Sequence, residues 1–186
     1  MLIPVLIIAG VLLLWLALSY NSLVSKRNAA DKAFASIDAM AKKRYDLIPN
    51  LVSTVQNYMK HEKETLTQIT EMRARATSGN ISEEEKIDLD QKVSRAVSGI
   101  MVAVENYPDL KASTNFMQLQ GALNEVEEQL SAARRFFNAA VTDLNNAVQM
   151  FPTNIVASMF NFKTRKLFEI TEQERQNVDV KALFSS

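Results

Sequence analysis

Residues 2–18 form a continuous apolar run without a charged or strongly polar side chain. Together with Ser19 and Tyr20, the run would be about 28 Å long as an α-helix, which nearly matches the roughly 30 Å hydrocarbon core of a bilayer. Trp15 and Tyr20 lie near its C-terminal end, where aromatic rings favour the membrane interface. The pattern predicts a transmembrane anchor over residues 1–20. The side chains expected to contact the bilayer are Leu2, Leu6, Leu13, Trp15, Leu18 and Tyr20.

The flanks of this run predict that it is retained and how it is oriented. Residues 17–19 resemble a signal-peptide cleavage site, but no basic region precedes the run and the run is longer than a usual signal segment, so an uncleaved anchor is expected. No lysine or arginine precedes the run, whereas Lys26, Arg27 and Lys32 follow it. The positive-inside rule then places the body in the cytoplasm, with a periplasmic body as the alternative.

A heptad stripe of apolar side chains runs through residues 34–76, with Arg44 among its few exceptions. A sustained seven-residue repeat is typical of a long, coiled-coil-like helix that packs on other helices. The stripe therefore predicts one helix that passes through Pro49. Residues 78–80, Ser-Gly-Asn, favour the left-handed conformation that closes a helix, so we expect the end near Thr77.

Pro49 should bend this helix. Proline lacks an amide hydrogen and its ring crowds the preceding turn, so a kink is expected between Tyr45 and Pro49 at a cost of about 3 kcal/mol. The cations at 42–44 point in different directions around a helix, so they cannot all face one phosphate. We interpret them as a solvated face near the membrane, with Arg44 as the one that could pair with an acid.

Two further helices are indicated downstream. Ser82 followed by Glu85 is a capping box, which predicts a helix start, and the Tyr-Pro pair at 107–108 predicts its end. Apolar side chains then recur with alternating three- and four-residue spacing through residues 116–151. That spacing predicts a long helix that buries one face along its full length, and Pro152 should stop it.

The last apolar stretch, residues 155–170, is rich in aromatic residues and turns basic toward its end. It predicts a shorter helix whose apolar face covers the bundle, and an interfacial helix lying on the membrane is the alternative. A tail is expected from residue 172. The candidate residues for assembly or membrane-surface contact are Phe160, Phe162, Lys163, Arg165, Lys166 and Phe168.

Composition agrees with a helical fold, because helix-forming residues are plentiful while glycine and proline number only four each in 186 residues. We therefore predict an all-α chain. It should have a transmembrane helix at residues 1–20, an antiparallel up-and-down bundle of about four long helices at residues 21–171, and a tail at residues 172–186.

The formal net charge is zero at pH 7 and cysteine is absent. A neutral chain lacks the basic excess of a nucleic-acid-binding protein, so no nucleic acid partner is expected. Without cysteine there are no disulfides, thiolate metal sites or thiol nucleophiles. Thr65 stands where a zinc motif beginning at His61 would need its second histidine. We predict no catalytic, metal-binding or cofactor-binding residues, and hence no enzyme.

An enzyme with an unrecognised site is the least favoured alternative. It would need a buried cluster of polar side chains, and a fully apolar bundle interior would exclude it. Helix capping, interhelical hydrogen bonds or simple exposure account for the same residues. The residues considered for such a cluster are Asn21, Asn50, Asn115, Arg134, Arg135, Asn138 and Asn145.

Several stretches of the chain are distinctive: YNSLVSKRNAADKAFASID after the anchor, KKRYDLIPNLVSTVQNYMKHE around Pro49, and NIVASMFNFK near the C-terminus. In these stretches, in their order and in their spacing, the chain resembles the bacterial LemA family over essentially its whole length. The resemblance implies an N-terminal membrane anchor, an antiparallel helical bundle and no established catalytic activity.

Two functions remain open from the sequence. The first is a non-enzymatic scaffold that is anchored in the bacterial inner membrane and self-assembles into a homo-oligomer. Apolar helix faces longer than a small bundle needs, and the aromatic C-terminal stretch, favour it. The alternative is an accessory or regulatory subunit of another membrane protein, such as a protease or a signalling kinase. The expected partners are the lipid bilayer and further copies of the chain, with an unidentified membrane protein in the alternative.

Overall fold

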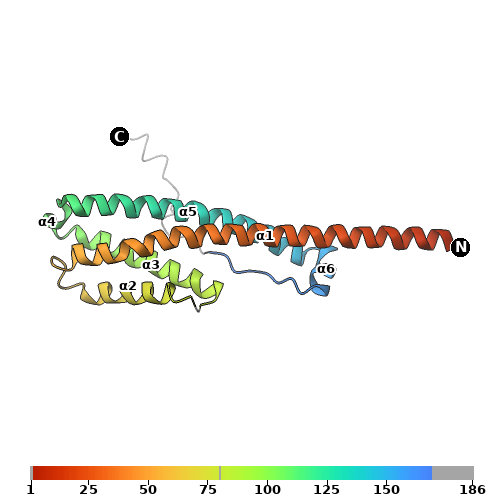
Figure 1. The fold of residues 1–186 in the computed structure, drawn as a ribbon, viewed down its shortest axis with the longest axis horizontal. Helices are drawn as coiled ribbons and strands as arrows, with labels where there is room; N and C mark the ends of the chain where they lie inside the picture. Colours follow the sequence, from red (N-terminus) through yellow and green to blue (C-terminus); the bar gives the residue numbers. More distant parts are fainter. Residues whose placement is uncertain (1, 80, 169–186) are drawn as a thin grey trace, which may run out of the picture.

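The computed structural model describes residues 2–79 and 81–168, and all regular secondary structure in these ranges is α-helical (Figure 1). The predicted all-α class is confirmed. The helices are α1 (Leu2–Val55), α2 (Lys63–Ala76), α3 (Glu83–Val104), α4 (Pro108–Lys111), α5 (Thr114–Gln149) and α6 (Thr153–Met159). The tail predicted at residues 172–186 lies outside the described residues.

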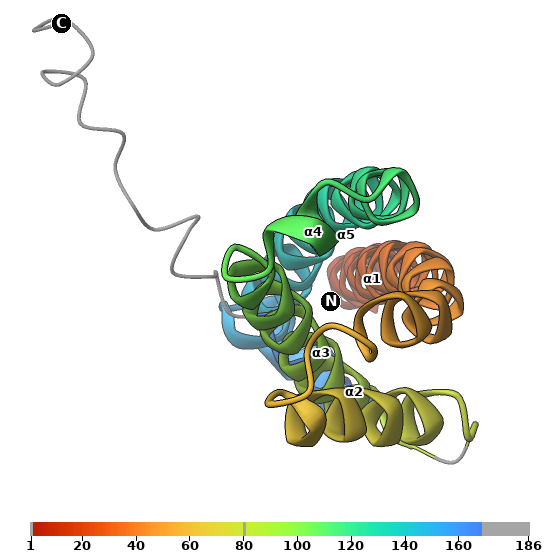
Figure 2. The same ribbon diagram turned by 90° about the vertical axis from the view of Figure 1, so that its left-hand side faces the viewer.

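Helices α1, α2, α3 and α5 run alternately up and down and form the predicted antiparallel bundle (Figure 1). α1 lies along α5, and α2 packs on α3 at the other side of the bundle (Figure 2). With 54 residues, α1 is about 81 Å long. Its N-terminal part projects from the bundle and its C-terminal part lies within it, so a single helix joins the anchor to the core.

The predicted apolar stripes form this core. Buried side chains recur every three or four residues over residues 30–55 of α1 and over residues 116–144 of α5. That spacing gathers them on one face of each helix. Phe34 of α1 packs against Phe137 of α5, with ring centroids 5.6 Å apart. Burial of these two faces against each other and against α3 holds the long helices together.

The single helix predicted over residues 34–76 is wrong, because α1 ends at Val55. The chain turns over residues 56–62 and α2 runs back along the bundle. The Tyr107 hydroxyl donates a hydrogen bond to Glu62 at 2.9 Å, which ties this turn to the end of α3. The apolar repeat continues through the turn because α2 buries its own stripe against α3, so periodicity alone did not reveal the reversal.

Pro49 does not end α1, which continues to Val55, and the bend expected there stays a prediction. The cations at 42–44 lie far from the anchor. Arg44 is 24 residues beyond Tyr20, or about 36 Å along the helix. The predicted solvated, membrane-side face is wrong for Arg44, because its side chain is completely buried.

The helix boundaries predicted further along the chain are confirmed. The Ser82 hydroxyl accepts a hydrogen bond from the Glu85 amide at 3.2 Å, and α3 begins there. Pro108 occupies the first turn of α4. α5 ends at Gln149, before the proline that was expected to stop it. Gly79, which follows α2, has a φ of 76°, the left-handed conformation that favours glycine.

The helix predicted over residues 155–170 is wrong for residues 160–168, and residues 169–170 lie outside the described residues. α6 ends in a Schellman-type cap, in which the Phe162 amide donates to the Ala157 carbonyl at 2.9 Å and Asn161 has a positive φ of 55°. Residues 162–168, which we call the strap, then run along the bundle without helical structure (Figure 1). Contacts with α1, α3 and α5 replace the internal hydrogen bonds of a helix.

Candidate membrane-proximal site

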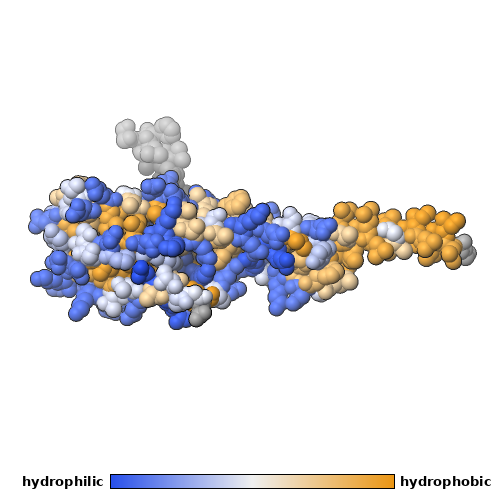
Figure 3. Space-filling view, in the orientation of Figure 1, coloured by the Kyte–Doolittle hydropathy of each residue, from blue (hydrophilic) through white to orange (hydrophobic). Residues whose placement is uncertain are grey.

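The anchor projects beyond the bundle and its apolar side chains are exposed around the helix. Figure 3 shows a mostly hydrophobic projection attached to a body whose surface is mixed polar and hydrophobic. Among the described residues, α1 is the one helix with a segment long and apolar enough to cross a membrane. The predicted anchor side chains Leu2, Leu6, Leu13 and Leu18 are exposed, and Trp15 is half-buried. This helix fits a single-pass membrane protein.

Helix α6 packs against the end of the anchor and forms a small apolar cluster with α1. We call this cluster the collar, and it consists of Tyr20, Leu23, Val156, Ala157, Phe160 and Phe162. The Tyr20 ring centroid lies 4.7 Å from that of Phe160 and 6.0 Å from that of Phe162. Trp15 contacts the cluster from the anchor side. The aromatic residues at the end of the anchor are thus joined to a segment that follows them by more than a hundred residues.

The outer side of the collar leaves large apolar side chains uncovered. These are Met150, Phe151, Ile155, Met159 and Phe160, with Phe151 80% exposed and Phe160 48% exposed. They lie on α6 and directly before and after it, next to the end of the anchor. Apolar and aromatic side chains at this level match the interfacial layer of a bilayer, where a short amphipathic segment buries its apolar face.

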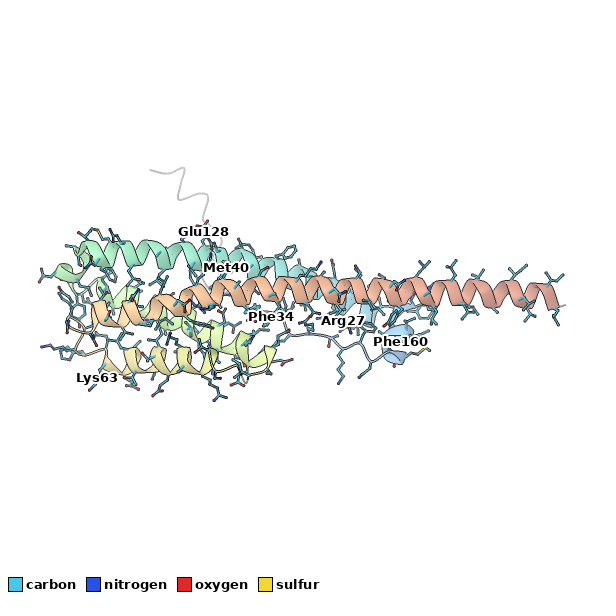
Figure 4. All side chains as sticks on the ribbon, viewed as in Figure 1. Arg27, Phe34, Met40, Lys63, Glu128 and Phe160 are labelled. Carbon is cyan, nitrogen blue, oxygen red and sulfur yellow. The ribbon has the colours of Figure 1, made fainter. Side chains whose placement is uncertain are left out.

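The predicted membrane-proximal cations lie on α1 within 12 residues after Tyr20, and Figure 4 labels Arg27 among them. The Arg27 guanidinium lies over the Phe162 ring at 5.3 Å, a cation–π contact. Lys32 and Lys163 are exposed and Lys26 is half-buried. Within residues 2–79 and 81–168, none of these four cations forms an ion pair with a carboxylate.

The strap is held on α5 by two asparagine side chains. Asn138 donates from Nδ2 to the Phe168 carbonyl and accepts at Oδ1 from the Phe168 amide, each at 2.9 Å. Asn145 makes the same pair of bonds to Arg165, at 3.0 and 2.8 Å. Two asparagines that were considered for an enzyme site therefore bind backbone, as an interhelical or capping role would require.

The side chains of the strap are also bound by the chain. Arg165 pairs with Asp31 at 2.6 Å and with Glu83, and Lys166 pairs with Asp88 at 2.7 Å. Burial lowers the pKa of Arg165, but hydrogen bonds to the two carboxylates raise it by more, so its net pKa lies above the usual value.

Phe168 completes the strap as a core residue. Only 3% of it is exposed, and its ring packs edge-on against Phe137 at 5.5 Å. Of the six candidate residues for assembly or membrane contact, Phe168, Arg165 and Lys166 are therefore engaged within the chain. Phe160, Phe162 and Lys163 lie at the membrane-proximal end, where the collar meets the strap.

A second site lies deep in the bundle, where a cluster of charged residues crosses the core. Arg44 is 0% exposed and donates to Glu127 at 3.0 Å, to Ser94 at 2.5 Å and to Asp90. Arg134 donates to the other oxygen of Asp90 at 2.5 Å and to Ser94 at 2.9 Å. Two cations thus face two carboxylates across α1, α3 and α5.

The charges of this ionic cluster balance within the bundle. Burial lowers the pKa of Arg44, but the charges of Asp90 and Glu127 raise it by more, so the guanidinium stays protonated. Burial first, and then the charge of Asp90, raises the pKa of the neighbouring Tyr45 hydroxyl above 10.0. Paired and hydrogen-bonded in this way, the cluster links three helices in one fixed register.

The ionic cluster borders a cavity of about 470 Å³ that Tyr45, Asp90 and Phe168 help to line. The lining mixes three aspartates with two lysines and an arginine, so it carries no excess charge. In the described part of the chain, no group of three or more histidine, cysteine, aspartate or glutamate side chains is placed to hold a metal ion. The Ser94 hydroxyl donates a hydrogen bond to Glu127 within the cluster. The bundle interior is therefore not fully apolar, and the condition that would have excluded an enzyme site is not met.

Sequence reasoning missed most of this cluster. Arg134 was considered, but Asp90, Ser94 and Glu127 were not. One signal was present, because Arg44 occupies a core position of the heptad stripe. A cation that is fully buried at such a position needs a partner of opposite charge. Its carboxylate partners lie 46 and 83 residues away, and only the fold brings them together.

The chain is similar in sequence to known proteins. The family model of the LemA family matches residues 33–182. Protein LemA of Metamycoplasma hominis is 27% identical over 163 residues, which cover 88% of this chain and 74% of that protein. Magnetosome protein MamQ 2 of Paramagnetospirillum magneticum is 21% identical, covering 83% and 66%, and magnetosome protein MamQ of Magnetospirillum gryphiswaldense is 20% identical, covering 82% and 65%. The chain belongs to the LemA family.

Proposed function

We propose that the chain is a non-enzymatic scaffold, anchored in the bacterial inner membrane with its body in the cytoplasm, that self-assembles into a homo-oligomer. The observation that carries the proposal is the uninterrupted α1, which is exposed and apolar over the anchor and buried in the bundle core further along. Because one helix serves both parts, the body has a fixed direction relative to the membrane.

A fixed direction favours assembly. Copies inserted in one membrane stand parallel, so their association loses less rotational freedom than association in solution and proceeds at a high local concentration. Closed symmetric assemblies of identical copies are also the commonest kind of soluble oligomer. The membrane thus aligns the copies before they associate, which favours the proposed assembly.

The outward face of α5 offers a contact surface for such assembly. Phe136 is 65% exposed, and the exposed alanines Ala132 and Ala139 lie one turn to either side of it. Small neighbours let another helix approach a large apolar side chain closely. The same surface supports the alternative, in which the chain is an accessory subunit and another membrane protein covers Phe136.

The collar supports the membrane part of the proposal. The exposed apolar side chains beside it lie next to the end of the anchor, and four cations with no carboxylate partner in residues 2–79 and 81–168 follow along α1 and at the start of the strap. This order of apolar, aromatic and basic groups follows the order of hydrocarbon core, interface and headgroup in a bilayer. The predicted cytoplasmic body follows from the same cations.

Mass photometry of the full-length chain extracted in mild detergent tests the scaffold directly. We expect particles whose protein mass is a multiple of 20.9 kDa, and Phe136→Glu should shift them toward the monomer. Gln118→Glu, which adds the same charge at another exposed position of α5, is the matched control. A strictly monomeric chain would overturn self-assembly. Heavier particles containing a second protein would favour the accessory subunit.

A further inference from the structure

We propose that the strap lies in a peptide-recognition groove, and that in the assembled state this groove binds the strap of a second copy. The groove is formed by α5 at its floor, by α1 on one wall and by α3 on the other. This inference rests on the proposed self-assembly and names the segment and the surface through which copies join.

The floor of the groove recognises backbone rather than a particular side chain. The four hydrogen bonds from Asn138 and Asn145 go to the amide and carbonyl of two strap residues. The asparagines are seven residues apart on a helix, about 10.5 Å. The strap residues are three apart, about 10 Å in an extended chain. The spacing of the two asparagines thus matches that of an extended segment bound antiparallel to α5.

The walls of the groove add recognition of charge. Asp31 of α1 and Glu83 of α3 hold Arg165 from two sides, and Asp88 of α3 holds Lys166. Three carboxylates on two helices therefore select a basic pair in the middle of the bound segment. The uncharged floor and the acidic walls together define an occupant that is extended and basic.

The far end of the groove is a socket for an aromatic ring. Phe137 lies 5.5 Å from the Phe168 ring, and the Arg134 guanidinium lies 5.9 Å from it on another side. The groove thus reads backbone, a basic pair and an aromatic side chain in a fixed order. The sequence Arg165-Lys166-Leu167-Phe168 meets each requirement, and every copy in a homo-oligomer carries it.

Exchange between copies keeps all of these contacts. The strap has no backbone–backbone hydrogen bond over residues 163–168 within the described chain, and the bonds described above are made by bundle side chains that every copy carries. Neighbours in one membrane stand at the same height and in the same direction. An exchanged strap would therefore enter the next groove in unchanged polarity and register, which is the condition for swapping an identical element.

Cross-linking of introduced cysteines tests the exchange, since the native chain has none. Asp88→Cys and Lys166→Cys are placed in two differently tagged full-length copies, which are co-expressed and treated in membranes with a short bismaleimide. We expect a cross-linked dimer that carries both tags. The double variant D88C/K166C in one chain shows that the two positions are within reach of the reagent.

A second pair controls for collisions between neighbours. Asp38 of α1 and Lys86 of α3 form an ion pair at 2.6 Å that lies wholly within the bundle and cannot be exchanged with the strap. Copies with Asp38→Cys and Lys86→Cys should give about tenfold less mixed dimer, because only the seated strap has a high effective concentration at its partner.

The outcomes separate the two proposals. A mixed dimer from D88C and K166C well above the collision control supports strap exchange. Mixed dimer no higher than this control, with oligomers still present by mass photometry, overturns strap exchange and leaves self-assembly standing. Absence of both the mixed dimer and the oligomers overturns both. A link confined to the double variant shows that the groove binds only its own strap.

Discussion

The interior of the body and its membrane end use the same residue types in opposite ways. In the interior Arg44 is fully buried and bound to two carboxylates. At the membrane end Arg27 and Lys163 are exposed and have no carboxylate partner in residues 2–79 and 81–168, and exposed apolar side chains lie beside them. The difference teaches that a cation within the bundle fixes helices, whereas a cation near the collar is left available to the membrane.

The largest expected effect comes from breaking the ionic cluster. Arg44→Ala leaves Asp90 and Glu127 buried without their shared partner, so we expect it to lower the free energy of unfolding by about 3–5 kcal/mol. Arg27→Ala should change it by no more than about 0.5 kcal/mol, because no buried group loses a partner. Urea unfolding followed by circular dichroism measures both. Equal losses would remove the contrast between the bundle interior and the membrane end.

A smaller loss is expected where the strap meets the core. Phe168→Ala removes a ring that is 3% exposed and should lower the free energy of unfolding by about 3 kcal/mol. Phe151→Ala removes a ring that is 80% exposed and should have almost no effect in detergent. Thermal unfolding of the two variants compares them. If Phe151→Ala were the more destabilising, the strap would not be part of the core.

The collar predicts an effect on environment rather than on stability. A polarity-sensitive dye on Ile155→Cys should emit at a shorter wavelength in liposomes than the free dye does in water, because the membrane interface is less polar than water. The same dye on Lys63→Cys, at the distal end, should report water (Figure 4). Similar emission at both positions would place the collar outside the interface.

The smallest expected effect is that of pH on the strap. The hydrogen bond from Lys166 lowers the pKa of Asp88 below 3.8. The ionised form of Asp88 is thus more stable in the folded state than in the unfolded chain. Its contribution is complete above pH 3.8 and is lost as the pH falls through the lowered pKa. The pair is exposed and screened, so the effect is small.

Hydrogen exchange at the Phe168 amide, corrected for its intrinsic rate, measures this loosening. In the native chain, exchange should accelerate as the pH falls below 3.8. Asp88→Asn has no charge to lose, so it should exchange at the accelerated rate throughout, and the native chain should reach that rate once Asp88 is protonated. If acid left the exchange unchanged in the native chain while Asp88→Asn accelerated it, the ion pair would not respond to protonation as described.

Sequence periodicity was sufficient for the long helices because their apolar faces are long. It located α5 from a regular apolar stripe, and a capping serine located the start of α3. Both signals depend only on residues close together in the sequence. It failed at the turn over residues 56–62, since α2 continues the apolar repeat after the chain has reversed. A reversal is decided by tertiary contacts such as that between Tyr107 and Glu62.

The candidate site was predicted in part. The anchor, the aromatic residues at its end and the cations after it follow from composition along one segment. The strap was expected to be helical, because its aromatic residues suggested an apolar helix face. Asn138, Asn145 and three carboxylates hold it extended, and these partners come from other helices. No local pattern in residues 162–168 carries that information.

Self-assembly in the membrane is the central claim, and energy transfer between labelled copies tests it most directly. Full-length chains with donor or acceptor dye on Lys63→Cys are mixed in proteoliposomes, and the lipid-to-protein ratio is then raised. The account predicts that transfer persists on dilution, because copies remain joined. A fall in transfer to the value for randomly distributed labels at every dilution would contradict it.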